Sequence, residues 1–320
     1  RLVHGVLPAK SAAGNPGARE VSGQAQKDAF IKAIPLVFVL IWSTGFIVAR
    51  YGMPHAPPMG FLVIRFALSA LCFALWAWAS RARWPVGRVQ WRHLAVTGVL
   101  MHAGYLGGVW SAVKLGMGAG LVSLLVGLQP VLTAIWVSQV GASLGESAVS
   151  RRQWAGLGLG LAGLTLVVWQ KLGLGEISAV NLALAAVALL CITAGTLYQK
   201  RFVAPCDVRT ANLVQLLAAF AVTLPLALLE GGGFHWNLQL AGSMAWSVLV
   251  LTLGGSSLLY MLIQRGAATV VTSLLYLVPP CTAVMAWLLF DEPITLFTVA
   301  GIVLTAIGVS WVVRSNVKPG

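Results

Sequence analysis

The sequence predicts an all-α polytopic membrane protein: ten transmembrane helices forming a 5+5 inverted-topology repeat, with both termini in the cytoplasm. Three observations predict this fold. Of 320 residues, 58% are hydrophobic and 9% are charged, whereas a soluble domain carries about a quarter charged residues. The apolar residues gather into runs of membrane-spanning length, and the two halves of the chain carry related sequences.

Ten segments meet the length that a transmembrane helix needs, about 20 mostly apolar residues. The connections between them are short and hold nearly all the ionisable groups. Helices are expected because the bilayer offers no water to backbone polar groups and the runs lack the alternation of barrel strands. The expected spans are 34–50, 59–79, 92–112, 117–139, 153–170, 179–199, 210–229, 244–263, 268–290 and 296–313. They divide the chain into a flexible basic tail (1–33), a first repeat (34–170) and a second repeat (179–314).

The orientation follows from the basic residues in the connections, which collect on the cytoplasmic side of membrane proteins. The predicted spans put 17 of the 21 Lys and Arg on the side that holds both termini, and Arg50, Lys114 and Lys171 on the other. Arg65 stays inside a span. Both termini are therefore expected in the cytoplasm. The net charge of +13 is then explained by the excess of basic residues on the cytoplasmic side of the membrane. No connection is long enough to build a nucleic-acid-binding surface.

The clearest internal repeat contains a proline in each copy. Ala119–Ala134 (AGLVSLLVGLQPVLTA) matches Ala268–Ala283 (ATVVTSLLYLVPPCTA) with a shift of 149 positions, and Pro130 falls on Pro279. Each half contains five spans, an odd number, so the second half must enter the membrane from the opposite side. The result is an inverted repeat, and interrupted helices at corresponding places in the two halves indicate a transport site.

Several short motifs occur in the order and spacing of a known superfamily. They are Ile41–Phe46 (IWSTGF), Phe61–Ala67 (FLVIRFA), Ala119–Ala134, Leu144–Glu146 (LGE), Gly156 to Gly163, Tyr260–Ala268 (YMLIQRGAA), Pro279, Asp291–Glu292 (DE) and Gly301 to Gly308. With this doubled set, the chain resembles ten-helix members of the drug/metabolite transporter superfamily with two EamA-type halves. The resemblance implies an inner-membrane carrier, usually an exporter of amino acids, other metabolites or drugs.

The acidic residues argue against proton coupling through a carboxylate within the membrane. All eight Asp and Glu lie in tails or connections. The smaller multidrug relatives in the superfamily use a glutamate in the first span, and the first span here has none. Glu146 and Glu292 occupy equivalent helix ends in the two halves, where a structural or topological role is expected.

Two ionisable side chains lie inside spans, and each has two interpretations. Arg65 either caps carbonyls and packs helices, or pairs with a substrate carboxylate. With a shift of 150, its equivalent is the neutral Gln215. His102 lies in the middle of the third span, where an interhelical hydrogen bond is the commoner role and a proton relay the rarer one.

The prolines and the aromatic residues complete the expected transport site. Pro130, Pro279 and Pro280 cannot donate backbone hydrogen bonds, so they are expected to kink the fourth and ninth spans and to act in gating. The kinks alternatively serve packing alone. The residues expected to line a cavity between the halves are Trp42, Arg65, His102, Tyr105, Ser123, Gln129, Tyr198, Tyr260 and Tyr276. Aromatic groups with polar tips suit a substrate with an apolar part and a charged head.

Other chemistry finds little support in the sequence. The run Gly158–Gly163 satisfies G-x-G-x-x-G, but it lies inside a span rather than after a strand. Together with Gly156 it is expected to form a small-residue face, Gly156-xxx-Gly160, for close helix packing. The four cysteines show no metal-type or paired spacing, and no catalytic grouping is apparent, so neither a metal nor a cofactor is expected.

The sequence therefore predicts a non-enzymatic secondary transporter of the inner membrane. It is expected to export a small amphipathic metabolite, such as an amino acid, including an aromatic one, by alternating access. The expected partners are this small molecule and membrane lipid, without nucleic acid, and the protein is expected to function as a monomer. The alternatives are a membrane-embedded enzyme or scaffold, a drug efflux carrier and a channel.

Overall fold

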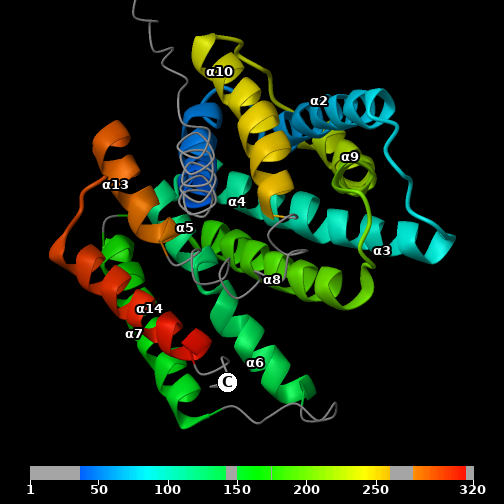
Figure 1. The fold of residues 1–320 in the computed structure, drawn as a ribbon. Helices are drawn as coiled ribbons and strands as arrows, with labels where there is room; N and C mark the ends of the chain where they lie inside the picture. Colours follow the sequence, from blue (N-terminus) through cyan, green and yellow to red (C-terminus); the bar gives the residue numbers. More distant parts are fainter. Residues whose placement is uncertain (1–36, 142–149, 174, 260–276, 315–320) are drawn as a thin grey trace, which may run out of the picture. The chain divides into compact units, whose positions relative to one another are not determined.

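The computed structural model describes residues 37–141, 150–173, 175–259 and 277–314, and their regular structure is helical throughout. Phe38–Gly320 forms one compact unit by its contacts. The elements (Figure 1) are a first helix Val37–Gly52, α2 (Pro58–Ala79), α3 (Arg88–Gly98), the π-helix η1 (Val99–Gly104), α4 (Tyr105–Lys114), α5 (Ala119–Val126), α6 (Gln129–Gly141), α7 (Arg151–Gly173), α8 (Ala179–Phe202), α9 (Val208–Glu230), α10 (Leu238–Trp246), the π-helix η3 (Ser247–Ser256), α13 (Val278–Phe290) and α14 (Leu296–Arg314).

Each of the ten predicted spans overlaps a helix in the described part of the chain. Four helices are long and apolar enough to cross a membrane: Pro58–Ala79, Ala179–Phe202, Val208–Glu230 and Leu238–Leu259. Shorter apolar helices accompany them. Large apolar side chains such as Leu75 (56% exposed) and Leu229 (84% exposed) face outward, as lipid-facing positions do. The fold is that of a multi-pass membrane protein, and the count of ten crossings stays a prediction.

Several helices start at side chains that satisfy the free backbone N–H groups of the first turn. Ser178 and Asn181 form a reciprocal capping box at the start of α8. Asn237 accepts from the Leu240 N–H at the start of α10 (2.8 Å). Asp207 does the same for α9, where its carboxylate accepts from the backbone N–H of Arg209 (3.0 Å). These caps set where the helices begin.

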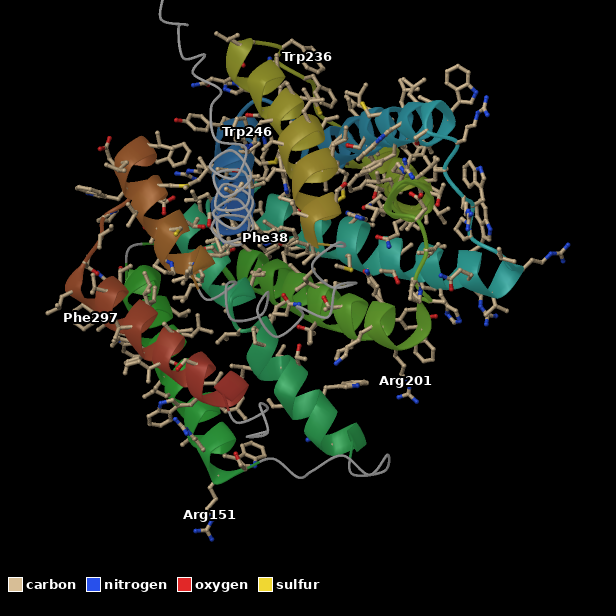
Figure 2. The ribbon with its side chains drawn as sticks, in the orientation of Figure 1. Phe38, Arg151, Arg201, Trp236, Trp246 and Phe297 are labelled. Carbon is tan, nitrogen blue, oxygen red and sulfur yellow. The ribbon has the colours of Figure 1, made fainter. Side chains whose placement is uncertain are left out.

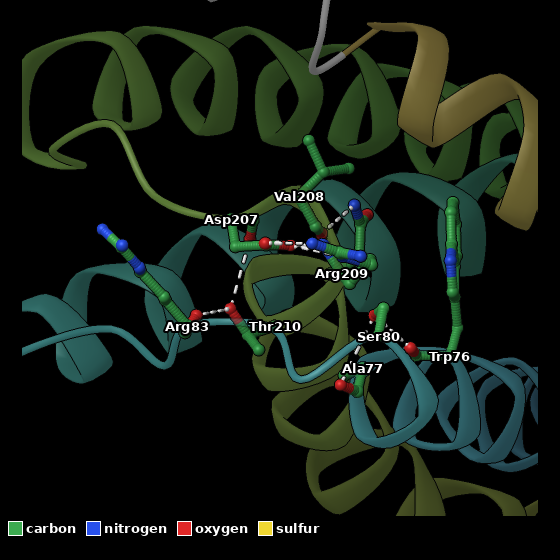
Figure 3. A network of polar contacts seen from close by, with 9 residues as sticks. Trp76, Ala77, Ser80, Arg83, Asp207, Val208, Arg209 and Thr210 are labelled. Carbon is green, nitrogen blue, oxygen red and sulfur yellow. Dashed lines mark hydrogen bonds and ion pairs between the residues drawn. The ribbon is translucent and has the colours of Figure 1, made fainter.

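The start of α9 is held by a polar network that also involves the preceding connections (Figure 3). Asp207 pairs with the Arg209 guanidinium, whose Nε donates to the carboxylate at 2.8 Å. This bond, together with the Arg209 backbone N–H, holds the pKa of the Asp207 carboxyl below its usual range. Thr210 donates its hydroxyl to the Arg83 carbonyl at 2.9 Å, which fastens the connection between α2 and α3 to α9.

The fourth predicted span is two helices, and the break lies before its proline. Leu128 donates to the Leu125 carbonyl and Val131 to the Leu128 carbonyl, at 3.1 and 2.9 Å. These i to i−3 bonds tighten the chain between α5 and α6. Pro130 is thus the second residue of α6, where a missing N–H costs little because first-turn N–H groups have no intrahelical acceptor.

The prolines of the ninth predicted span have the same local role. Pro279 and Pro280 lie in the first turn of α13, and the first backbone bond of this helix comes from the Cys281 N–H to the Leu277 carbonyl (3.1 Å). Pro279 also packs against the break in the fourth span, since a Cβ on Gly127 would lie 2.9 Å from Pro279 Cγ. The break in the fourth predicted span and the start of α13 therefore meet directly.

Helix pairs far apart in the sequence pack side by side. α2 packs on α9, α5 on α13, and α7 on α14, while α4 and η1 pack on α8 (Figure 1). The first helix lies against η3, where a Cβ on Gly45 would contact Leu251. Trp246, labelled in Figure 2, donates its indole N–H to the Thr44 hydroxyl at 2.9 Å. Residues from both halves thus share one core.

Glycines let α7 and α14 approach to backbone contact. A Cβ on Gly163 would lie 2.6 Å from the Gly301 carbonyl oxygen and 2.9 Å from the Thr305 nitrogen. A Cβ on Gly308 would lie 2.6 Å from the Gly160 nitrogen. Gly156 and Gly160 contact Gly308 of α14, so the predicted small-residue face is confirmed. Gly163 of the G-x-G-x-x-G run also packs on α14, whereas a Cβ on Gly158 would meet no atom within 4 Å.

Candidate functional site

A cavity lies among residues of both halves. About 80 Å³ of it is open to the centres of water molecules, which is room for several waters. Residues of the first half that line it are Trp42, Gly45, Phe46, Arg65, Met101, His102, Tyr105, Leu106 and Trp110. Residues of the second half are Ile192, Gln199, Asn212, Gln215, Leu251, Ser256 and Leu259.

Many of these lining residues are equivalent under the internal repeat. The shift of 150 that relates Arg65 to Gln215 also relates Trp42 to Ile192, Met101 to Leu251, and Leu106 to Ser256, and all eight line the cavity. Equivalent positions of the two halves therefore meet around one space. These positions correspond but their chemistry does not, because each of these pairs joins two different side chains.

The two π-helices stand at equivalent positions and both contribute to the cavity. Shifted by 150, the residues 99–104 of η1 become 249–254, which lie within η3 (Ser247–Ser256). Met101 and His102 line the cavity from η1, and Leu251 and Ser256 from η3. π-Helical segments are rare and are often found at functional sites, because the wider turn re-aims side chains. No feature of the sequence signalled them.

Arg65 is the charged side chain in the described lining of the cavity. It is 5% exposed and projects from α2. Its Nε and Nη2 donate to the Thr252 hydroxyl in η3, at 3.3 and 3.2 Å. Its Cζ lies 5.7 Å from the centroid of the Trp110 ring, within the range of a cation–π interaction. Both contacts are neutral, so they orient the guanidinium without compensating its charge.

His102, Tyr105 and Trp42 surround the space near Arg65. Gln215 of α9 lines the same cavity as His102, and Phe66 meets the imidazole edge-on with ring centroids 6.1 Å apart. Tyr105 and Trp42 line this cavity as well. Four of the predicted cavity residues, Trp42, Arg65, His102 and Tyr105, are thus brought together, and their roles in binding stay predictions.

The structure places three other predicted cavity residues away from this space. Ser123 is buried in α5, where its hydroxyl donates to the Gly120 carbonyl (2.7 Å). The Gln129 amide donates to the Thr196 hydroxyl of α8 (3.0 Å). The Tyr198 hydroxyl is 2.8 Å from Nδ1 of His93, across the contact of α8 with α3. Gln129 and Tyr198 therefore join neighbouring helices, and the Ser123 bond stays within α5. Tyr260 and Tyr276 lie outside the described residues.

The prolines also lie away from the cavity lining. Pro279 and Pro280 border a separate gap of about 10 Å³ with Gly127 and Thr305, close to the least space that holds one water. Pro130 is buried at the start of α6. A gating role concerns movement of the proline-containing segments during transport, and it stays a prediction.

Two carboxylates of the second half cap helices of the first half. Glu230, the last residue of α9, accepts from the backbone N–H groups of Met59 (2.8 Å) and Gly60 (3.2 Å) at the start of α2. Glu292, just after α13, accepts from Ala119 (3.0 Å) and Gly120 (3.4 Å) at the start of α5. Negative charge is favourable at a helix N-terminus. Glu146 lies outside the described residues.

Comparison with known proteins identifies the family. The sequence profile of the EamA-like transporter family matches residues 31–169 and 180–314. The chain belongs to the EamA-like transporter family. The family predicted from the motifs is therefore confirmed, and this EamA-like protein is a multi-pass membrane transporter.

Individual relatives match the EamA-like chain over most of its length. It is 26% identical over 293 residues to a probable amino-acid metabolite efflux pump of Salmonella typhimurium, covering 88% of this chain and 93% of the relative. A probable amino-acid metabolite efflux pump of Escherichia coli is 23% identical over 307 residues, with 90% and 97% covered. A solved crystal structure superposes with a TM-score of 0.63 at 16% identity, covering 89% of this chain and 97% of the other. That likeness shows a shared fold.

The repeat could have identified lining residues of this EamA-like transporter that were missed. Ile192, Leu251 and Ser256 look like ordinary span residues by composition, and Gln199 and Asn212 lie near span ends. Three of the five follow from the predicted or neighbouring cavity positions by the shift of 150. Among the described residues, no three His, Cys, Asp or Glu side chains lie together as metal ligands would.

Proposed function

We propose that this EamA-like transporter is an inner-membrane secondary transporter that exports a small amphipathic metabolite, such as an amino acid, by alternating access. The observation that carries the proposal is the cavity lined by repeat-equivalent residues of both halves. A space bounded in this way opens to either side when one half rocks against the other. The names of the Salmonella typhimurium and Escherichia coli relatives support export of amino-acid metabolites.

The proposed topology has ten spans in two inverted halves, with both termini in the cytoplasm. The helix pairs support it, because α2 with α9, α5 with α13, and α7 with α14 join repeat-equivalent spans. Such pairing is expected around a pseudo-two-fold axis. Basic residues at helix ends support the orientation: Arg151 and Arg201 extend away from the ends of α7 and α8 (Figure 2). The cavity and both repeats belong to one chain, so the proposed working unit is a monomer without a cofactor.

In the proposed cycle, the break in the fourth predicted span and the start of α13 form the moving contact. The break between α5 and α6 packs on Pro279 at the start of α13, and a broken helix bends more easily than a continuous one. On the non-cytoplasmic side, release of the Glu230 and Glu292 caps from α2 and α5 would separate the halves. The driving force is the gradient of the substrate itself, since no Asp or Glu lines the cavity among the described residues.

Counterflow into proteoliposomes tests the proposal. Purified protein is reconstituted with a panel of unlabelled amino acids and related metabolites inside, and uptake of the matching labelled compound is measured against protein-free liposomes. We expect saturable counterflow for at least one compound. Absence of counterflow over the whole panel, by protein with an unchanged circular dichroism spectrum, would contradict transport.

The gating role of the prolines is tested in the same assay with Pro130→Ala and Pro279→Ala. Both positions are in first turns, so alanine is expected to keep the helices and cost at most about 1 kcal/mol of stability. A gating role predicts a changed rate at an unchanged apparent affinity. Wild-type rates in both variants would leave the prolines with a packing role alone.

A further inference from the structure

The cavity has a charge but no counter-charge among the described residues. Its lining there contains Arg65 and no Asp or Glu. The hydrogen bonds of the guanidinium go to the neutral hydroxyl of Thr252, and the ring of Trp110 is neutral as well. A buried cation is costly unless an anion pairs with it. The site therefore gains most by accepting an anionic group.

The form of the cation favours a carboxylate as this group. A guanidinium presents five N–H donors in a planar fork, which matches the two oxygens of a carboxylate. Thr252 accepts from Nε and Nη2, so the remaining donors of Nη1 and Nη2, which have no other acceptor among the described residues, are available to a ligand. Trp110 and Thr252 fix the orientation of the fork before a ligand arrives, which lowers the entropy cost of binding.

The second half supplies hydrogen-bonding groups without charge. Gln199, Asn212, Gln215 and Ser256 line the cavity there. Amide and hydroxyl oxygens accept hydrogen bonds from an ammonium group, and they accept water or a ligand hydroxyl equally well. An ammonium group in this cavity would therefore be tolerated, without the ionic partner that a carboxylate finds in Arg65.

We infer that the cavity selects an organic carboxylate with an apolar body, that Arg65 binds its carboxylate, and that a substrate amino group is dispensable. The inference rests on the proposed function in one respect, that the cavity is where the substrate binds. It narrows the substrate class: amino acids belong to it, their deaminated acids belong to it equally, and the corresponding amines do not. Trp42 and Tyr105 would contact the apolar body.

Matched compounds test this on the wild-type protein. Each set shares one side chain: tryptophan, indole-3-propionate and tryptamine form one set, and leucine, 4-methylpentanoate and isoamylamine form another. Binding is measured by calorimetry and by the rise in unfolding temperature, because free acids and amines leak through bilayers and confuse flux measurements. We expect the deaminated acid of a set to bind about as tightly as the amino acid, and the amine about 10- to 100-fold more weakly.

Variants of Arg65 test whether this residue causes the preference for acids over amines. In Arg65→Gln the side chain becomes that of its repeat equivalent, and we expect the acid and the amine of a set to bind equally weakly. Arg65→Lys keeps the charge without the fork and should retain part of the preference. Arg201→Gln makes the same change at an exposed position outside the lining, and should keep the full preference.

The outcomes separate the inference from the proposed function. Amines that bind as tightly as the acids, or no binding by either set, would overturn the inference. If Arg65→Gln fails to fold, the comparison of acid with amine on the wild-type protein still decides it. A preference for acids without any counterflow would support the carboxylate site and reject transport. Counterflow of compounds that lack a carboxylate would support transport and reject the carboxylate site.

Discussion

Substitution of Gly163 by alanine tests the closest helix contact of the fold. Gly163 lies in α7 and faces α14, and its Cβ would be 2.6 Å from the Gly301 carbonyl oxygen, 2.7 Å from Thr305 Oγ1 and 2.9 Å from the Thr305 nitrogen. Two of these three atoms belong to the backbone of α14, which cannot rotate away. The added methyl group therefore forces the two helices apart.

The expected loss of stability is estimated by comparison with a matched substitution on the same helix. Gly158 also lies in α7, and its Cβ would meet no atom within 4 Å. Alanine raises helix propensity by about 0.8–1 kcal/mol at either position, so this contribution cancels in the comparison. Overpacking costs about 1–3 kcal/mol. We expect Gly163→Ala to be less stable than Gly158→Ala by about this amount.

The assay is reversible unfolding in mixed micelles, followed by circular dichroism as sodium dodecyl sulfate is raised. The unfolding midpoint of Gly163→Ala should lie below that of the wild-type protein, and that of Gly158→Ala at or above it. Gly308→Ala, which would press on the Gly160 backbone from the other helix, should behave like Gly163→Ala. Equal unfolding midpoints for the two variants of α7 would refute backbone contact between α7 and α14.

Two further predictions concern carboxylates outside the cavity. Glu292→Gln should lower the free energy of unfolding by about 0.5–1 kcal/mol, because it removes a negative charge from the start of α5; the neighbouring Asp291→Asn is the control, and an equal loss there would contradict the assignment. Asp207→Asn keeps a capping side chain and removes the ion pair with Arg209, which contributes at most about 1 kcal/mol at this partly exposed site. Folding lowers the pKa of Asp207. The stabilisation by the Asp207 carboxylate is therefore present above the unfolded pKa of about 3.9 and is lost as the pH falls below the folded pKa. Amide hydrogen exchange at the start of α9 should be faster in the variant than in the wild-type protein at pH 7, and equal in the two near pH 2.

The helices and their glycine contacts could be predicted because their causes are local in the sequence. Apolar runs of membrane length mark the helices, and the spacing of Gly156 and Gly160 places both on one face of α7. In α14, Gly301 and Gly308 are the repeat counterparts of Gly156 and Gly163. Gly308 contacts Gly156 and Gly160, and Gly301 contacts Gly163. In these cases one segment carries all the information, and the repeat tells which segments correspond.

The contacts between the halves could not be predicted in the same way. The Glu292 carboxylate reaches the N–H groups of α5, 172 residues away in sequence, and nothing near Glu292 signals that partner. Gln129 and Tyr198 have the polar and aromatic character of lining residues, but they bond to Thr196 and His93 instead. A polar residue in a span needs a partner, and composition does not distinguish a neighbouring helix from a cavity.

Equivalent positions of the two halves line the cavity with different side chains, and the pair Arg65 and Gln215 shows why. Both positions line one cavity, so an arginine at each would place two cations around it, with no Asp or Glu in the described lining to separate them. Like charges buried together are unfavourable. A glutamine at the second position keeps hydrogen-bonding capacity and avoids the repulsion. The repeat thus brings equivalent positions together, and divergence between them leaves one positive and one neutral polar group in the lining, a pair that suits a carboxylate with a neutral or dispensable second group.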